Sequence, residues 1–124
     1  MKVPIAMHHI HFWVAESTVP EIKAWYAKMF GAKPGKRGDN EADDLPGVNL
    51  TFTKTPDATA PTKGRVLDHI GFEVKNLQTF CKKLEAAGQK FDRPYTKTPF
   101  GLSIAFLTDP WGTYIELTEG LDKL

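Results

Sequence analysis

Residues 9–14, His-Ile-His-Phe-Trp-Val, and residues 69–74, His-Ile-Gly-Phe-Glu-Val, are two versions of one short pattern. In each stretch the apolar residues fall on every second position, which is typical of a β-strand with one buried face. The two stretches begin 60 residues apart (69 − 9 = 60), close to half of the 124-residue chain. We therefore interpret the chain as an internal repeat of two modules.

An amphipathic helix is predicted after each of these strands, because apolar residues recur there at helical spacing. The first stripe contains Ile22, Trp25, Met29 and Phe30, and the second contains Leu77, Phe80, Leu84 and Ala87. Thr18 stands where the first helix would begin, and Gly31 stands where it would end. Asn76 and Gly88 bracket the second helix in the same way.

More strands follow each helix. The candidates are 33–39 and 47–54 in the first module, and 91–96, 102–108 and 113–118 in the second. The last two form a hairpin around the turn sequence Asp109-Pro110-Trp111-Gly112. We expect one domain over residues 1–124, with module one at about 5–54, a linker at about 55–64 and module two at about 65–120.

Composition excludes several classes of protein. The chain is 41% hydrophobic and 25% charged with a net charge of +1, so we expect a globular protein that binds neither nucleic acid nor an anionic membrane. Cys81 is the single cysteine, which excludes an intrachain disulfide and a multi-cysteine metal site. No apolar run has the length of a membrane span, and a cytoplasmic location is expected.

Strand alternation places His9, His69 and Glu116 on faces turned away from the helices. Two imidazoles and a carboxylate that meet in one concavity would form a divalent-metal site with open coordination positions. Such an ion could polarise a carbonyl or stabilise an enolate or catecholate. Each residue taken singly is more often a satisfied polar side chain than a metal ligand, so the common face is what favours the site.

The sequence resembles the vicinal oxygen chelate superfamily, which includes glyoxalase I, extradiol dioxygenases, fosfomycin-modifying enzymes and bleomycin-resistance proteins. The resemblance covers nearly the whole chain. Three motifs carry it: 9–14 before a helix that ends in Phe30-Gly31, 68–74, and 109–117 with Glu116 four residues after Gly112 (116 − 112 = 4). It implies an α+β fold in which two βαβββ modules form a cupped, barrel-like sheet with the helices outside.

The resemblance also implies a set of metal ligands. His9, His69 and Glu116 match three ligand positions for one divalent ion, which could be Fe, Mn, Zn, Ni or Co. Many relatives have a fourth ligand, usually Glu or Gln, on the strand that is 48–53 here. Asn49 and Thr51 stand there, and because neither is a usual strong ligand, a three-ligand site is favoured.

Two further positions depart from individual relatives. Trp13 occupies the place of a glutathione-binding Arg of glyoxalase I, and His11 stands where fosfomycin enzymes commonly carry Thr. On the same faces, His11 and Glu116 are the candidate catalytic residues. The candidate substrate-binding residues are Trp13, Asn49, Thr51 and Tyr114.

The resemblance implies a metal-dependent enzyme that chelates two neighbouring oxygens of a small substrate, with dioxygenase and lyase or isomerase chemistry both open. Small relatives commonly form homodimers, so His9 could come from one subunit and His69 with Glu116 from its partner. The alternative is a small-molecule binding or drug-sequestering protein of the bleomycin-resistance type, without catalysis. A domain that only dimerises is a third interpretation, and it predicts no metal.

Overall fold

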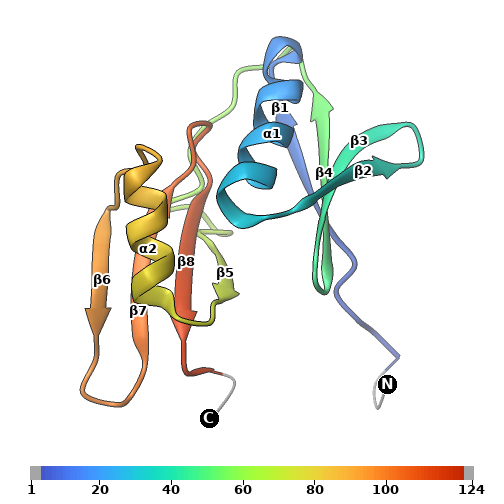
Figure 1. Ribbon diagram of the computed structural model, residues 1–124. Coiled ribbons are helices and arrows are strands. Elements are labelled where there is room, and N and C mark those ends of the chain that lie inside the picture. Colours follow the sequence, from blue (N-terminus) through green and yellow to red (C-terminus); the bar gives the residue numbers. More distant parts are fainter. Residues whose placement is uncertain (1–3, 122–124) are drawn as a thin grey trace. The chain divides into compact units, whose positions relative to one another are not determined.

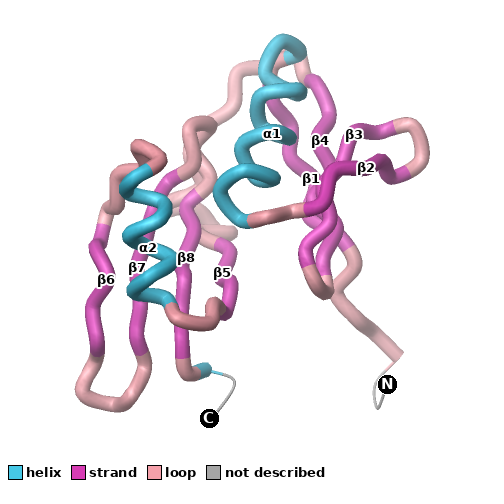
Figure 2. Tube along the Cα trace, viewed as in Figure 1, coloured by secondary structure: helices cyan, strands magenta, loops and turns pink. Residues whose placement is uncertain are grey.

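The computed structural model describes residues 4–121, which form two compact units that divide between Thr59 and Ala60. Each unit contains one α-helix and one open, four-stranded sheet (Figure 1). The α+β class and the two βαβββ modules are therefore confirmed. The unit boundary falls in the loop after Thr59, inside the segment 55–64 that the sequence predicts as the linker (Figure 2). The outermost residues of the predicted domain lie outside the described part of the chain.

The first unit follows the order strand, helix, three strands. Its elements are β1 (His9–Val14), a short 3-10 turn η1 (Glu16–Thr18), α1 (Val19–Phe30), β2 (Lys33–Arg37), β3 (Asn40–Leu45) and β4 (Val48–Lys54). The sheet order is β1-β4-β3-β2, with β1 parallel to β4 and the other pairs antiparallel.

The second unit repeats this topology. Its elements are β5 (Ile70–Glu73), α2 (Leu77–Ala86), β6 (Arg93–Lys97), β7 (Ser103–Thr108) and β8 (Tyr114–Glu119). The sheet order is β5-β8-β7-β6, and again the first and last strands, β5 and β8, pair in parallel. Within residues 4–121, neither α-helix is long and apolar enough to cross a membrane.

The core of the first unit lies between α1 and one face of its sheet. Ile22, Tyr26 and Met29 are the buried residues of α1. The Tyr26 ring lies 5.4 Å from the Phe12 ring and 6.0 Å from the Phe52 ring. Of the predicted stripe, Ile22 and Met29 are buried, whereas Trp25 and Phe30 are half-buried and Tyr26 takes the central place.

The core of the second unit is similar, with α2 packed by Leu77, Cys81 and Leu84. Ile115 and Leu117 of β8 are fully buried. Burial, followed by the negative charge of Glu85, raises the pKa of the Cys81 thiol to about 11. The thiol is therefore protonated at neutral pH, and Cys81 acts as a small apolar core residue.

A glutamate from β8 caps the start of α2. The Glu119 carboxylate accepts hydrogen bonds from the backbone N–H groups of Asn76 and Leu77, at 2.9 and 3.0 Å. Asn76 does precede the helix as predicted, but with φ +54° and without a hydrogen bond from its own side chain. The orphan N–H groups of the helix are thus satisfied by a residue more than 40 positions away.

The strand β3 is absent from the sequence prediction. Its sequence, Asn-Glu-Ala-Asp-Asp-Leu, is acidic and lacks the β-branched and aromatic residues that favour strands. It forms because it lies between β2 and β4, with which it pairs along its whole length.

Asp43 of β3 is a buried carboxyl group in the first unit. The residue is 0% exposed, and neither carboxylate oxygen has a hydrogen-bond partner among the described residues. Burial raises its pKa from 3.8 to about 6, Lys23 lowers the pKa and Asp44 raises it. Asp43 is therefore a neutral acid below pH 6 and an uncompensated buried charge above it.

We predict that Asp43 makes the folded state less stable as the pH rises. Because the pKa is higher in the folded than in the unfolded chain, the free energy of unfolding should fall between about pH 4 and pH 6 and then level off. A shift of about two pKa units corresponds to about 3 kcal/mol. Urea unfolding of the wild type and of Asp43→Asn is to be measured at pH 4 and pH 7. The free energy of unfolding should fall between these pH values in the wild type, and this fall should be absent in the variant. Asp57→Asn, at an exposed loop position, is the control, and an equal pH dependence in wild type and Asp43→Asn would refute the prediction.

Candidate functional site

Each sheet has one face covered by its helix, and we call the opposite face the open face. In the first unit the open face carries His9, His11 and Trp13 of β1, paired with Asn49, Thr51 and Thr53 of β4. In the second unit it carries Tyr114 and Glu116 of β8, with Phe106 of β7 directly opposite Glu116. His69 immediately precedes β5, next to these residues. All eight sequence-predicted site residues lie on or beside an open face.

His69 lies between two carboxylates. Its Nδ1 is 2.8 Å from Oδ2 of Asp68, and its Nε2 is 3.3 Å from Oε1 of Glu116. The His69 and Glu116 side chains are 38% and 26% exposed, so both can be reached by an ion or ligand. The structure thus brings together two of the three predicted metal ligands.

Asp68 orients the His69 ring. The amide of Gly64 donates a 2.6 Å hydrogen bond to Asp68 Oδ1. This bond, and next the one with His69, lower the pKa of Asp68, so its carboxylate is ionised at neutral pH and only accepts hydrogen bonds. His69 Nδ1 must therefore donate. Asp68 lies within the motif 68–74, but the sequence alone predicts no role for its side chain.

This arrangement leaves room for a proton or a metal ion between His69 and Glu116. In a neutral imidazole whose Nδ1 carries the hydrogen, Nε2 is an acceptor, and it would face the acceptor oxygen of Glu116. A proton or a metal ion between the two atoms resolves this conflict. Two donors bound at about 2.1 Å to one ion, at about 90 to 110°, are roughly 3.0 to 3.4 Å apart. The observed separation of 3.3 Å fits both cases.

The turn between β7 and β8 positions Tyr114 and Glu116. Oδ1 of Asp109 accepts hydrogen bonds from the backbone N–H groups of Trp111 and Thr113, both at 2.9 Å. Gly112 has φ +100°, a conformation that side-chain-bearing residues rarely adopt. The predicted hairpin is confirmed, and its register places Glu116 opposite Phe106.

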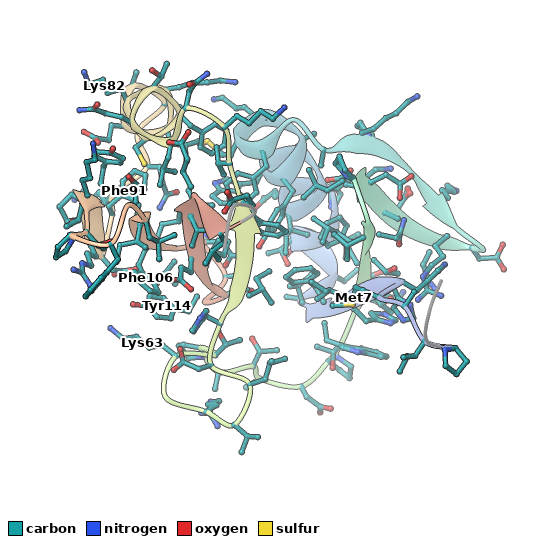
Figure 3. The ribbon with its side chains drawn as sticks, turned by 90° about the horizontal axis from the view of Figure 1, so that it is seen from below. Met7, Lys63, Lys82, Phe91, Phe106 and Tyr114 are labelled. Atoms are coloured by element: carbon teal, nitrogen blue, oxygen red, sulfur yellow. The ribbon has the colours of Figure 1, made fainter. Side chains whose placement is uncertain are left out.

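An aromatic cluster surrounds His69. The Phe106 and Tyr114 side chains lie side by side (Figure 3), with their rings stacked at 5.2 Å. Each ring meets the His69 ring edge-on, at 5.8 and 5.9 Å. Tyr114 was predicted on this face, whereas Phe106 was missed. The alternation within residues 102–108 was the signal that could have found it, because Phe106 follows the open-face position Ile104 by two residues.

In the first unit, His9 is exposed, and its Nδ1 lies 3.0 Å from Nδ1 of His8. Desolvation by its neighbours, followed by the positive charges of Arg37, His8 and His11, lowers the pKa of His9 below 6.5. A lower pKa favours the neutral imidazole at neutral pH, which is the form that binds a metal ion.

His11 and Trp13 form a stacked pair on the same face. Their rings lie 5.0 Å apart with an interplanar angle of 11°. The Nε2 atom of His11 is 2.5 Å from Oγ1 of Thr53, which fixes the ring orientation. Trp13 is 54% exposed, so a large aromatic surface faces outward beside the imidazole.

Asn49 and Thr51 are engaged in a hydrogen-bond network within the sheet. Thr51 is 0% exposed, donates to Oδ1 of Asn49 at 2.7 Å and accepts from Nε of Arg37 at 2.7 Å. Asn49 also donates to Asp44 at 2.7 Å. In this arrangement the oxygens of both residues are used internally, which agrees with a three-ligand metal site. Their roles in substrate binding stay predictions.

The candidate ligands are divided between the two units. His69 and Glu116 belong to the second unit and His9 to the first. Among residues 4–121, no group of three or more His, Cys, Asp or Glu side chains is placed to hold a metal ion.

Comparison with known proteins identifies the family. The model of the "Glyoxalase/Bleomycin resistance protein/Dioxygenase superfamily" matches residues 6–117, which is most of the chain. No curated protein matches the sequence at a significant level.

Solved structures of similar fold cover almost the whole chain. A putative glyoxalase family protein from Bacillus anthracis has a TM-score of 0.76 at 14% identity, covering 95% of this chain and 96% of that one. TioX from Micromonospora sp. ML1 has a TM-score of 0.70 at 19% identity, covering 91% and 98%. Lactoylglutathione lyase from Agrobacterium tumefaciens has a TM-score of 0.67 at 20% identity, covering 94% and 95%. At these identities the likeness establishes the fold alone.

We predict that Asp68→Asn weakens metal binding by about 10- to 100-fold, because the ring of His69 loses the carboxylate that orients it and raises its basicity. Calorimetric titration of metal-free protein with Zn²⁺ measures this directly. Asp57→Asn is a matched control, since Asp57 lies in the exposed loop 55–60. Equal zinc affinities for wild type and Asp68→Asn would show that Asp68 has no such role.

Proposed function

Because the chain belongs to the Glyoxalase/Bleomycin resistance protein/Dioxygenase superfamily, we propose that it is a metal-dependent enzyme that chelates two neighbouring oxygens of a small substrate. The observation that supports this most is the placement of His69 between the carboxylates of Asp68 and Glu116. One carboxylate orients the ring, and the other faces the nitrogen that would bind the ion. Such a pair is expected of two ligands to one metal.

The proposed ligands are His9, His69 and Glu116. Two neutral imidazoles and one carboxylate leave a divalent ion with a net positive charge and with free coordination positions. When bound, Fe, Mn, Zn, Ni or Co would supply Lewis-acid stabilisation of negative charge on the chelated oxygens. The lowered pKa of His9 supports its part in this set, since the ring is more readily neutral.

The other open-face residues are assigned to proton transfer and substrate contact. His11 is the proposed general base, and Glu116 has a catalytic role besides its role as a ligand. The hydrogen bond between His11 and Thr53 and the stacked Trp13 hold the imidazole in place. Trp13 and Tyr114 offer aromatic surface to the substrate, and Asn49 and Thr51 are the polar contacts proposed for it.

We also propose that the protein acts as a homodimer in the cytoplasm on a small-molecule substrate, and that dioxygenase and lyase or isomerase reactions are the two candidate classes. The single cysteine, Cys81, is free and buried, and the cytoplasm is the compartment that we propose. The second candidate function is binding without catalysis. It is favoured if the metal is absent or has no open coordination position.

We predict about one equivalent of a transition metal per chain in protein purified without chelators or nickel resin. His9→Ala, His69→Ala and Glu116→Ala should each lose it, because each removes one of three ligands. Glu85→Ala is the control, because Glu85 is an exposed glutamate of α2, and this variant should keep the metal. Plasma mass spectrometry gives both the amount and the identity of the metal.

The metal then directs the activity assays. Iron or manganese would lead to oxygen uptake with catechols, and zinc, nickel or cobalt to α-oxo-aldehyde and epimerase substrates. No metal in the native protein, and none taken up on titration, would refute the enzyme proposal and leave the binding protein as the better interpretation.

We predict that the site is shared between subunits of a dimer. When His9→Ala and Glu116→Ala chains are unfolded together and refolded, each mixed dimer should regain one intact site, since the undamaged His9 of one chain meets the undamaged Glu116 of the other. Metal content should rise from near zero to about one ion per mixed dimer. No recovery, or only monomer in light scattering, would contradict the shared site and favour ligands from one chain.

A further inference from the structure

Lys63 places a positive charge beside the second unit's candidate ligands. Its amine lies 4.9 Å from the centroid of the Tyr114 ring, over the ring face (Figure 3). We propose that Lys63 binds an acidic group of the substrate, so that the substrate is a planar compound with two neighbouring oxygens and a carboxylate. This inference rests on the proposed function, because the two oxygens are the atoms that the metal would chelate.

The planar part of the substrate is inferred from the aromatic cluster. Phe106 and Tyr114 stack nearly in parallel, 5.2 Å apart with an interplanar angle of 22°. Phe106 pairs across the sheet with Glu116, and both rings contact His69 edge-on. A molecule held at His69 and Glu116 therefore lies next to aromatic surface, which favours aryl or enolic compounds through stacking.

Lys63 is held in place by the loop around it. The residue before it, Thr62, donates its backbone N–H to the carbonyl of Gly112 at 2.9 Å. The hydroxyl oxygen of Thr62 accepts a hydrogen bond from the backbone N–H of Tyr114 at 2.9 Å. The residue after it, Gly64, donates to Asp68 at 2.6 Å. Lys63 is therefore flanked by two anchored residues, one tied to the strand of Glu116 and one to the carboxylate that orients His69.

The close contact of this loop with the β7–β8 turn requires a glycine. A Cβ atom at Gly112 would lie 3.1 Å from Cα of Pro61, and the φ of Gly112 is +100°. The path of residues 61–64 is thus fitted to the turn that leads to Tyr114 and Glu116. Lys63 keeps its position relative to both residues for this reason.

The charge of Lys63 is available to a ligand. Within residues 4–121 its amine has no carboxylate within ion-pair distance, and the side chain is exposed. The contact with Tyr114 orients the amine without neutralising it. The charge of Lys63 helps to lower the pKa of Asp68, but the two side chains form no ion pair in the described part of the chain. Asp68 and Glu116 both face His69, so an acidic group of the substrate is the ion-pair partner that we assign to Lys63.

The test measures ligand binding to zinc-loaded protein, because Zn²⁺ has no redox chemistry and binding can be followed without turnover. The probes are 3,4-dihydroxybenzoate and its neutral isostere 3,4-dihydroxybenzamide, with dissociation constants from calorimetry. The preference for the acid is the dissociation constant of the benzamide divided by that of the benzoate. This ratio should be about three- to tenfold higher in the wild type than in Lys63→Met, since a charged contact near the surface contributes modestly. Lys63→Arg should retain the preference, and Lys75→Met, at another exposed lysine, should leave it unchanged.

The outcomes separate the two proposals. A preference for the acid that is the same in wild type and Lys63→Met, or no preference in the wild type, overturns the inference while the bound zinc leaves the metal site standing. A wild type that takes up no zinc overturns the proposed function and the inference with it. Loss of the preference in Lys63→Met alone, with unchanged zinc affinity, supports the inference.

Discussion

The parallel pairing of β1 with β4, and of β5 with β8, constrains each module. Parallel neighbours cannot be joined by a tight turn, so a longer connection must link them. In each module the helix leads to the far edge of the sheet, and antiparallel strands then bring the chain back beside the first strand. Because the helix covers one face, the alternation of side chains sends every second residue to the open face. His9 and Glu116 lie on open faces for the same reason, one on the first strand of its module and one on the last.

Local patterns in the sequence predicted much of this. The strand 9–14 has the same bounds in the structure, and the Asp109 turn forms as its residues indicate, because both depend on neighbouring residues. β3 could not be predicted in this way. Its acidic sequence has little strand propensity, and its conformation comes from pairing with strands on both sides.

Features that depend on distant residues were also beyond the sequence. Trp25 and Tyr26 are adjacent, and only the position of Phe12 and Phe52 decides that Tyr26 fills the core. The cap on α2 comes from Glu119 on another element. At the candidate site, the sequence predicted His69 and Glu116 as ligands from their residue types and positions. The role of Asp68 depends on the contact of its carboxylate with Nδ1 of His69, while Nε2 faces Glu116, and only the structure shows this.

Asp68 uses its two oxygens for two separate partners, the backbone of Gly64 and the ring of His69. A backbone amide is the same whichever side chain stands beside it, so residue 63 can be exchanged without loss of either hydrogen bond. After gene duplication, one copy could therefore change the group that it recognises at position 63 and still inherit the orientation of His69. In this module, selectivity and ligand geometry can evolve as independent traits.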